Sequence, residues 1–213
     1  MFRDRAQAGQ LLSEKLRAYA DSPDAIVLGL PRGGVPVAYE IAKALRLPLG
    51  VLLVRKIGAP SQPELAIGAV AANGAKVMDW KLAERLEISP EELDDITARE
   101  EAELRAREAL YGKAALLDNL ENRTVIVVDD GIATGASMRA AVQVLGSLRA
   151  AKIIVAVPVA PPAAQREFAS AGYEFVYLRL SEYFPSVSWF YRDFSQVEDQ
   201  TVRRLLSQAH SPE

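Results

Sequence analysis

The sequence contains no cysteine and only one histidine, His210. The absence of cysteine excludes a disulfide framework, a thiol nucleophile and a metal site with cysteine ligands. His210 lies in the polar stretch Ser-Gln-Ala-His-Ser-Pro-Glu. We therefore expect neither histidine-centred catalysis nor a zinc site.

Long hydrophobic runs and a strong net charge are also missing. No run of about 18 apolar residues occurs, and the first residues, Met-Phe-Arg-Asp-Arg, lead into no apolar signal core. The formal net charge of −3 gives no global attraction to nucleic acid. With 50% hydrophobic and 25% charged residues, the composition is that of an ordinary soluble domain. We expect a cytoplasmic protein whose main partner is neither a membrane nor a nucleic acid.

One stretch, residues 125–148, combines the signals of a strand, a loop and a helix. Val125–Val128 is a short β-branched run, typical of a strand buried on both faces of a parallel sheet. Asp129 and Asp130 follow directly, and a loop with glycine and hydroxyl residues comes next. Apolar residues then recur with helical spacing at Met138, Ala141, Val142, Leu145 and Leu148.

The loop of this unit has the features of a phosphate site. Gly131 and Gly135 allow the backbone to turn its N–H groups inward, and the helix that follows presents free N–H groups at its positive end. Thr134 and Ser137 add hydroxyl donors. The two acids suit the hydroxyls of a sugar that bears the phosphate, or a metal ion near it. The alternative is a strand end whose acids cap the helix.

An apolar strand, two acids, a short loop and Thr-Gly-x-Ser together resemble the phosphoribosyl-pyrophosphate (PRPP) motif of type I phosphoribosyltransferases. The resemblance implies transfer of the ribose 5-phosphate group from PRPP to a small nitrogenous acceptor, such as a nucleobase, with release of pyrophosphate. It implies Mg²⁺ held through substrate and water, without direct protein ligands. It also implies that Asp129 and Asp130 are catalytic and bind the ribose, and that the 5-phosphate is bound by Ala133, Thr134, Gly135, Ala136 and Ser137.

A second loop, Pro31-Arg32-Gly33-Gly34, lies between the apolar run Ala25–Leu30 and a helical pattern from Val35 to Leu45. It places an arginine beside two glycines at the carboxyl end of a strand, where open α/β sheets bind ligands. The resemblance makes this the pyrophosphate loop, with Arg32, Gly33 and Gly34 as binding residues and Arg32 as a catalytic residue. A plain strand-to-helix turn is the alternative.

Two further cations, Arg55 and Lys56, follow the apolar run Leu49–Val54. We expect them at the carboxyl end of that strand, where they would also meet the pyrophosphate. A solvated strand end is the alternative. The patterns around Arg32, Arg55 and Asp129 extend the resemblance over most of the chain, to a bacterial group of predicted phosphoribosyltransferases without an assigned acceptor.

The alternation of strand and helix signals predicts a doubly wound, mostly parallel α/β sheet in one domain, residues 1–213. The five expected core strands are 25–30, 49–54, 125–128, 153–159 and 173–178. Within this domain we expect a mobile loop and hairpin at 57–78, an inserted helical segment at 89–118, and a C-terminal hood and helix at 179–213. An N-terminal helix around residues 11–19 should cover one end of the sheet.

Turn and cap signals refine these segments. Residues 58–64 predict a loop, and Asn73-Gly74 predicts a hairpin. The resemblance to type I phosphoribosyltransferases implies that this loop is mobile and closes over the substrate. Ser89-Pro90-Glu91-Glu92 predicts a helix start with a capping box, and the helix ends near Gly112 or Leu117. Ser195-x-x-Glu198 predicts a second capping box before the last helix. Aromatic residues at 183–194 are expected to pack in the core or a dimer contact, with one of them free to stack on the acceptor.

The acceptor itself is not defined by these motifs. Ala133 stands where 6-oxopurine phosphoribosyltransferases carry an aspartate that contacts the base, which disfavours hypoxanthine or guanine. The alternative function is a regulatory protein of the same fold that senses PRPP without catalysis, but no helix face carries a broad run of Lys and Arg. We expect a homodimer, because the helix after Ser89 has an incomplete apolar stripe. We also expect the Asp130 side chain to lack a buried partner.

Overall fold

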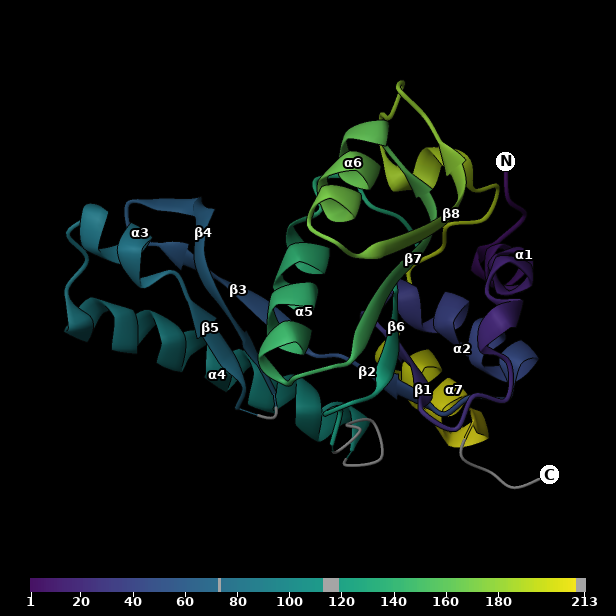
Figure 1. Ribbon diagram of the computed structural model, residues 1–213, viewed down its shortest axis with the longest axis horizontal. Helices are drawn as coiled ribbons and strands as arrows, with labels where there is room; N and C mark the ends of the chain where they lie inside the picture. Colours follow the sequence, from purple (N-terminus) through teal and green to yellow (C-terminus); the bar gives the residue numbers. More distant parts are fainter. Residues whose placement is uncertain (73, 113–118, 210–213) are drawn as a thin grey trace.

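The computed structural model describes residues 1–72, 74–112 and 119–209 (Figure 1). Its larger sheet has five parallel strands in the order β2-β1-β6-β7-β8. These strands are β1 (Ala25–Gly29), β2 (Leu49–Val51), β6 (Thr124–Val128), β7 (Lys152–Ala160) and β8 (Glu174–Leu180). The predicted five-stranded, doubly wound α/β sheet is therefore confirmed.

Helices cover both faces of this sheet. One face packs against α1 (Arg5–Lys15), α2 (Gly34–Leu45) and α7 (Asp199–Ala209), and the other against α5 (Ala136–Ser147) and α6 (Pro162–Ser170). The side chains of β1 alternate accordingly: Val27 joins the first core and Leu28 the second. Short 3₁₀ turns follow α1 (η1, Arg17–Tyr19) and β8 (η3, Val187–Phe190).

The strand order places a topological switch point between β1 and β6. After β1 the chain moves outward to β2, and from β6 it moves the other way through β7 to β8. The two central strands stay paired to their ends, where the N–H of Leu30 donates to the Val128 carbonyl at 2.8 Å. In open α/β sheets the crevice beyond such strand ends binds ligands. The loops after β1 and β6, each with the start of the helix that follows, carry all the predicted site residues except Arg55 and Lys56.

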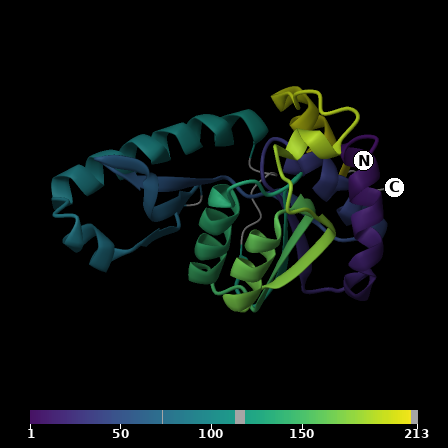
Figure 2. The ribbon, with the colours of Figure 1, turned by 90° about the horizontal axis from the view of Figure 1, so that it is seen from above.

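Residues 54–111 form an arm beside the main sheet (Figure 1). It contains an antiparallel sheet of β3 (Val54–Ala59), β4 (Gln62–Ala71) and β5 (Lys76–Met78), and the helices α3 (Trp80–Arg85) and α4 (Pro90–Tyr111). In Figure 2, α4 runs along this sheet toward α7, which it contacts. On the other side α5 packs against β3, β4 and β5 and so joins the arm to the main sheet.

The start of α4 is formed as predicted. The Ser89 hydroxyl accepts from the Glu92 N–H at 3.2 Å, and the Ser89 N–H donates to the Glu92 carboxylate at 3.0 Å, which completes the capping box. The helix ends at Tyr111, with Gly112 as its C-cap. The alternative end at Leu117 lies outside the described residues.

The buried face of α4 has a partner within the chain. Leu93, Thr97, Leu104 and Tyr111 are buried, and the helix packs on β3, β4 and α7. The apolar stripe of α4 is therefore buried within the chain, and no second subunit is needed to cover it. Thr97 and Tyr111 complete this buried face, but their hydroxyl groups kept them out of a count of apolar residues. The expectation of a dimer loses this support.

Two predictions about residues 49–64 are wrong. The strand predicted at 49–54 ends at Val51, and Arg55 and Lys56 lie inside β3 of the second sheet, not at the end of a core strand. The loop predicted at residues 58–64 is a tight hairpin, in which only Pro60 and Ser61 lie outside β3 and β4.

The backbone at Gly58 accounts for the difference between the predicted loop and the observed hairpin. The β3–β4 register shifts on both sides of Gly58, and a Cβ there would lie 2.4 Å from the Pro63 carbonyl oxygen. The glycine therefore permits a bulge with close backbone contact, and it does not mark an irregular segment. The hairpin predicted at Asn73-Gly74 is confirmed, because β4 pairs antiparallel with β5 and Gly74 has φ +82°. Asn73 lies outside the described residues.

The C-terminal segment differs from its prediction at one cap. The last helix begins at Asp199, and the Ser195 hydroxyl bonds the Asp193 side chain, so Ser195 does not cap α7.

Phe190 and Tyr191 are buried in a cluster with Ala8 and Val159, while Tyr183 and Trp189 are exposed and meet edge to face. Most rings of this segment thus pack in the core, as expected. No helix among the described residues is long and apolar enough to cross a membrane.

Candidate functional site

The loops after β1 and β6 touch each other at the switch point. A Cβ added to Gly33 would lie 2.0 Å from Oδ2 of Asp130, and one added to Gly34 would lie 2.5 Å from the Val128 carbonyl oxygen. Any larger residue would push the loops apart, so the two glycines allow this contact. The structure therefore brings Gly33 and Gly34 together with Asp129 and Asp130, which lie almost one hundred residues away in the sequence.

The loop before α5 presents an open helix start. Gly135 occupies the N-cap position with φ +79° and has no side chain to cap the helix, while the neighbouring Thr134 hydroxyl accepts from the Ala136 N–H at 3.5 Å. The first N–H groups of a helix have no intrahelical partner, so those at Ala136 and Ser137 form a ready site for an anion. Thr134 and Ser137 are exposed beside them.

Arg139 braces this loop from within α5. Its Nη2 donates to the Thr134 carbonyl at 2.8 Å, and its Nη1 donates to both carboxylate oxygens of Glu167 at 2.9 and 3.0 Å. The Glu167 contact offsets part of the charge of Arg139, and the Thr134 contact fixes the loop that leads into the N–H groups at the start of α5. No sequence pattern around Arg139 indicates this role.

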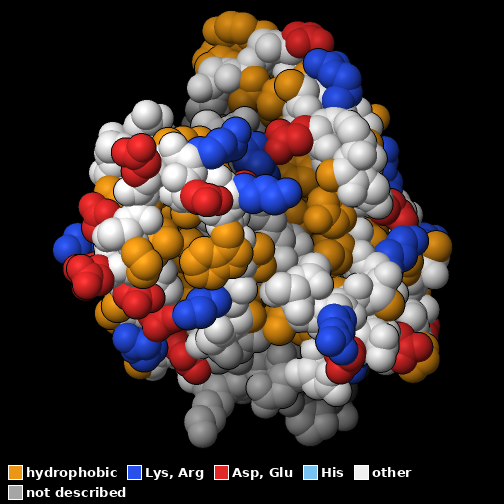
Figure 3. Space-filling model, turned by 60° about the vertical axis from the view of Figure 1, so that its left-hand side comes forward, with side chains coloured by type: hydrophobic (Ala, Val, Ile, Leu, Met, Phe, Trp, Pro, Cys, Tyr) orange, Lys and Arg blue, Asp and Glu red, His pale blue; other side chains and the backbone are white. Residues whose placement is uncertain are grey.

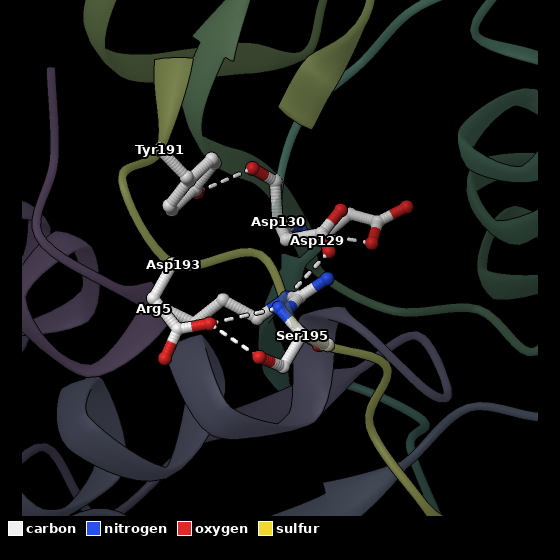
Figure 4. Close-up of polar contacts among 6 residues, drawn as sticks. All are labelled: Arg5, Asp129, Asp130, Tyr191, Asp193 and Ser195. Carbon is white, nitrogen blue, oxygen red and sulfur yellow. Dashed lines mark hydrogen bonds and ion pairs between the residues drawn. The ribbon is translucent and has the colours of Figure 1, made fainter. Parts of the chain in front are cut away.

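The two acids have different surroundings. Asp129 is half-buried, and its Oδ1 accepts from the Asp130 N–H at 2.8 Å. Asp130 is buried, and its Oδ2 accepts from Nε of Arg5 at 2.7 Å (Figure 4). The expectation that Asp130 has no buried partner is wrong, because the first residue of α1 lies against the strand end and no local pattern around residue 130 indicates this.

Burial and mutual repulsion control the charge of the acid pair. Burial raises the pKa of Asp129 well above its ordinary value, and the neighbouring Asp130 carboxylate raises it further. Burial also raises the pKa of Asp130, while the hydrogen bond and positive charge of Arg5 oppose that rise. Arg5 also lowers the pKa of Asp129. The pair thus depends on Arg5 for part of its negative charge.

Arg5 is held in place by residues from the C-terminal segment. Its Nη1 donates to the Ser195 carbonyl at 2.8 Å, and its guanidinium lies 3.7 Å from the centroid of the Phe194 ring. The Tyr191 hydroxyl donates to the Asp130 carbonyl at 2.6 Å, as Figure 4 shows. Sequence reasoning missed these roles for Arg5 and Tyr191. The aromatic composition of residues 183–194 was the one available signal, and it does not indicate a cation partner.

Arg32 takes part in a second polar cluster. Its Nη1 lies 3.8 Å from Oδ2 of Asp199, and the Tyr111 hydroxyl donates to Oδ1 of the same carboxylate at 2.5 Å. Burial and the Asp199 carboxylate raise the pKa of Tyr111, so this hydroxyl stays protonated as a donor. The loop after β1, the end of α4 and the start of α7 therefore meet at Asp199.

A cleft of about 520 Å³ lies between the main sheet and the arm. Of the predicted site residues, Arg55, Lys56, Ala136 and Ser137 line this cleft, together with Pro31 next to Arg32. The acids, Arg32 and the two glycines lie beside it and are not part of its lining. The structure thus brings the arm cations of β3 to the start of α5, although β3 belongs to a different sheet. The Glu100 carboxylate forms a salt bridge with Arg55 inside the cleft.

The side chains give limited support for a bound metal. The described residues contain no group of three or more His, Cys, Asp or Glu side chains suited to one ion. Asp129 and Asp130 are two carboxylates, and Arg5 already occupies an oxygen of the second. Mg²⁺ commonly uses one or two carboxylates together with substrate phosphates and waters. The residues present fit that arrangement and do not form a dedicated all-protein site.

These features define a protein of the phosphoribosyltransferase fold, and comparison with known proteins agrees. A family model described as phosphoribosyl transferase domain matches residues 4–174, and the chain belongs to this family. A curated Mycobacterium tuberculosis protein named "Putative phosphoribosyl transferase Rv0571c" is 40% identical over 210 residues, covering 99% of this chain. That alignment covers 47% of the relative, so the chain spans about half the length of the curated proteins it matches.

Solved structures show the same fold. The crystal structure of TT1426 from Thermus thermophilus superposes with a TM-score of 0.90 at 40% sequence identity, covering 99% of this chain and 100% of that one. The AQ2163 protein from Aquifex aeolicus gives a TM-score of 0.50 at 9% identity, covering 83% of this chain and 74% of that one, and so shows similarity of fold alone.

Proposed function

We propose that this chain is a phosphoribosyltransferase that moves the ribose 5-phosphate group of PRPP to a small nitrogenous acceptor. A nitrogen of the acceptor forms a bond to the anomeric carbon as the bond from that carbon to the pyrophosphate oxygen breaks. The acceptor nitrogen then loses its proton, and pyrophosphate leaves with the bonding electrons. The contact of Gly33 with Asp130 carries the proposal, because it joins the two loops that such a substrate would have to bridge.

Each part of PRPP has a chemically suitable partner in this arrangement. The N–H groups of Ala136 and Ser137 at the start of α5, with the Thr134 and Ser137 hydroxyls, suit the 5-phosphate. Asp129 and Asp130 suit the ribose hydroxyls, and Asp129 is the more accessible of the two. Arg32 and the N–H groups of Gly33 and Gly34 suit the pyrophosphate, with Arg55 and Lys56 across the cleft. Mg²⁺ would neutralise pyrophosphate oxygens while held through substrate and water.

The environment of the site suits the chemistry of the transition state. As the bond breaks, positive charge develops on the ribose and negative charge on pyrophosphate. Half-buried Asp129 lies on the ribose side and Arg32 on the other, and fixed charges of this kind act strongly where water is partly excluded. Arg5 keeps Asp130 aimed at a fixed position, so less reorganisation accompanies the reaction.

The acceptor end is assigned to the segment after β8. Val187 lies directly over Gly131, where an added Cβ would be 2.6 Å from its Cγ1, so this segment covers the loop that carries the acids. Tyr183 and Trp189 of the same segment are exposed rings that could stack on a planar base. On the face shown in Figure 3, positive and negative side chains are intermixed, which does not favour nucleic acid as the acceptor.

The test is a panel of nitrogenous bases and related compounds, incubated with PRPP, Mg²⁺ and the protein while pyrophosphate release is followed. We expect release that depends on the acceptor and falls strongly in an Asp129→Asn variant. Calorimetry should detect PRPP binding independently of the acceptor. Absence of PRPP binding at millimolar concentration would contradict the proposal. Binding without release for every acceptor would favour the PRPP-sensing alternative.

A further inference from the structure

The cleft wall formed by α4 carries two arginines to which the proposed function gives no role. Arg99 and Arg107 line the cleft and are exposed. In the part of the chain that the structure describes, neither forms an ion pair. Their neighbour Arg105 differs in both respects, since it lies outside the cleft lining and its Nη1 is 3.5 Å from the Glu101 carboxylate. The helix therefore directs two uncompensated cations into the cleft.

The charges that line the cleft are unequal. Arg55 and Lys56 of β3 face the α4 arginines, so four cationic side chains line a space of about 520 Å³. Glu100 is the single carboxylate among the described residues of this lining, and its salt bridge with Arg55 already uses it. Clefts lined by one sign of charge focus the field and concentrate ligands of opposite charge. The cleft is thus suited to a ligand with several negative charges.

The rest of the lining strengthens this effect. Leu52, Leu53, Ile96 and Leu104 are apolar and mostly buried, so they limit the solvent that screens the cations. The cleft borders Pro31 on one side and Ser137 on the other, next to the two loops assigned to the pyrophosphate and 5-phosphate groups. A polyanion in the cleft would lie beside the loop of Arg32 and would not need a separate entrance.

We propose that Arg99 and Arg107 bind the pyrophosphate group of PRPP, so that α4 forms a wall of the leaving-group site. This inference rests on the proposed function and deepens it. The residues lie eight positions apart, about 12 Å along the helix axis, and long flexible side chains allow both guanidinium groups to converge on one ligand. Their planar forks match phosphate oxygens, and they would stabilise the charge that grows on pyrophosphate as it leaves.

The test compares ligands that contain pyrophosphate with one that lacks it. Calorimetry with inorganic pyrophosphate, PRPP and ribose 5-phosphate, each with Mg²⁺, is carried out on the parent, Arg99→Gln, Arg107→Gln and the control Arg105→Gln. We expect each cleft substitution to weaken pyrophosphate and PRPP binding by roughly tenfold, since one charge-assisted contact is lost. Ribose 5-phosphate affinity should not change, and Arg105→Gln should bind all three ligands like the parent.

Other outcomes would overturn the inference in recognisable ways. If the parent binds PRPP and both cleft variants bind it equally well, α4 does not form the site and the proposed function still stands. If Arg105→Gln has the same effect as the cleft variants, the arginines act only through net charge. If ribose 5-phosphate weakens in parallel, the site is not selective for pyrophosphate. If the parent binds neither PRPP nor pyrophosphate, the proposed function fails together with this inference. Thermal unfolding of each variant verifies that it is folded.

Discussion

Nε of Arg5 lies 2.7 Å from Oδ2 of Asp130, and the two side chains are only 11% and 13% exposed. The pair joins the first residue of α1 to the loop that follows β6, across 125 positions of sequence. It gives a buried carboxylate a fixed direction and a counter-charge. The ribose end of the proposed site is therefore built jointly by the phosphoribosyltransferase motif and a helix outside that motif.

Replacing Arg5 should change how PRPP binding depends on pH. Arg5 lowers the pKa of both acids against the raising effect of burial, so Arg5→Gln should raise both pKa values further. Recognition of the ribose hydroxyls by these side chains requires carboxylates. As the pH is lowered, the Arg5→Gln variant should therefore lose its affinity for PRPP at a higher pH than the parent does. Calorimetric titrations at a series of pH values measure this shift.

Arg3→Gln is the matched control for that experiment. Arg3 lies two positions away, is 64% exposed and pairs with Asp4, so its loss should leave the pH profile unchanged. A profile for Arg5→Gln that coincides with the parent's would mean that Arg5 does not set the charge of the acids.

Asp129→Asn and Asp130→Asn should separate ligand binding from stability. Asp129 is the more accessible acid and has no ion pair with the described residues, so its substitution should weaken PRPP binding by roughly ten- to a hundredfold with little loss of stability. Asp130→Asn should also lower the free energy of unfolding, by about 1–3 kcal/mol, because Arg5 remains buried without its counter-ion. Denaturant unfolding and PRPP calorimetry on both variants measure this. An Asp130→Asn protein as stable as the parent would contradict the structural role of the pair.

Gly33→Ala should disturb both the loop and the acid behind it. The added methyl group would lie 2.0 Å from Oδ2 of Asp130, whose side chain cannot move freely because Arg5 holds it. We expect a loss of about 1–3 kcal/mol in stability from overpacking, together with weaker PRPP binding. Gly146→Ala is the control, since its Cβ would meet no atom within 4 Å. Because Gly146 lies within α5, its replacement by alanine should raise the free energy of unfolding by about 0.5–1 kcal/mol. Equal stability of the two variants would show that the loop contact is loose.

Tyr111→Phe should act on Arg32 through Asp199. The substitution removes a buried donor and should cost about 0.5–1.5 kcal/mol of stability. Asp199 then has one partner fewer and should pair more fully with Arg32, which competes with pyrophosphate for that arginine. PRPP binding should weaken without being abolished. Tyr183→Phe, at a residue that is 70% exposed, serves as the control. Unchanged PRPP affinity in Tyr111→Phe would show that Asp199 does not restrain Arg32.

The parts of the fold that sequence patterns predicted are those set by local signals. The β-branched run before Asp129 predicts a buried parallel strand, and the Ser89 capping box places the start of α4 at the correct residue. The Arg-Gly-Gly loop and the Asp-Asp loop were each recognised from their own residues. Their contact depends on the order of the strands in the sheet. The pattern of strands and helices reduces the number of possible orders but does not select one of them.

The remaining errors concern relationships between distant segments. Arg55 was expected at the end of a core strand because an apolar run leads directly into it, but the chain leaves the main sheet after Val51 and forms a new one. Ser195 has the spacing of a cap, yet its hydroxyl bonds Asp193, which precedes it. Arg5 and Asp199 gave no local signal, because their partners lie on other elements.

The position of Arg5 on the first turn of α1 has a consequence for motion in the protein. Helix ends open more readily than helix centres, and each opening of this turn would carry the guanidinium away from the buried acids. A ligand that requires ionised acids binds the closed form and therefore holds the turn shut. Amide hydrogens near the start of α1 should exchange more slowly when the ribose site is filled, so the N-terminal helix would report occupancy of a site whose recognised motif lies more than a hundred residues further along the chain.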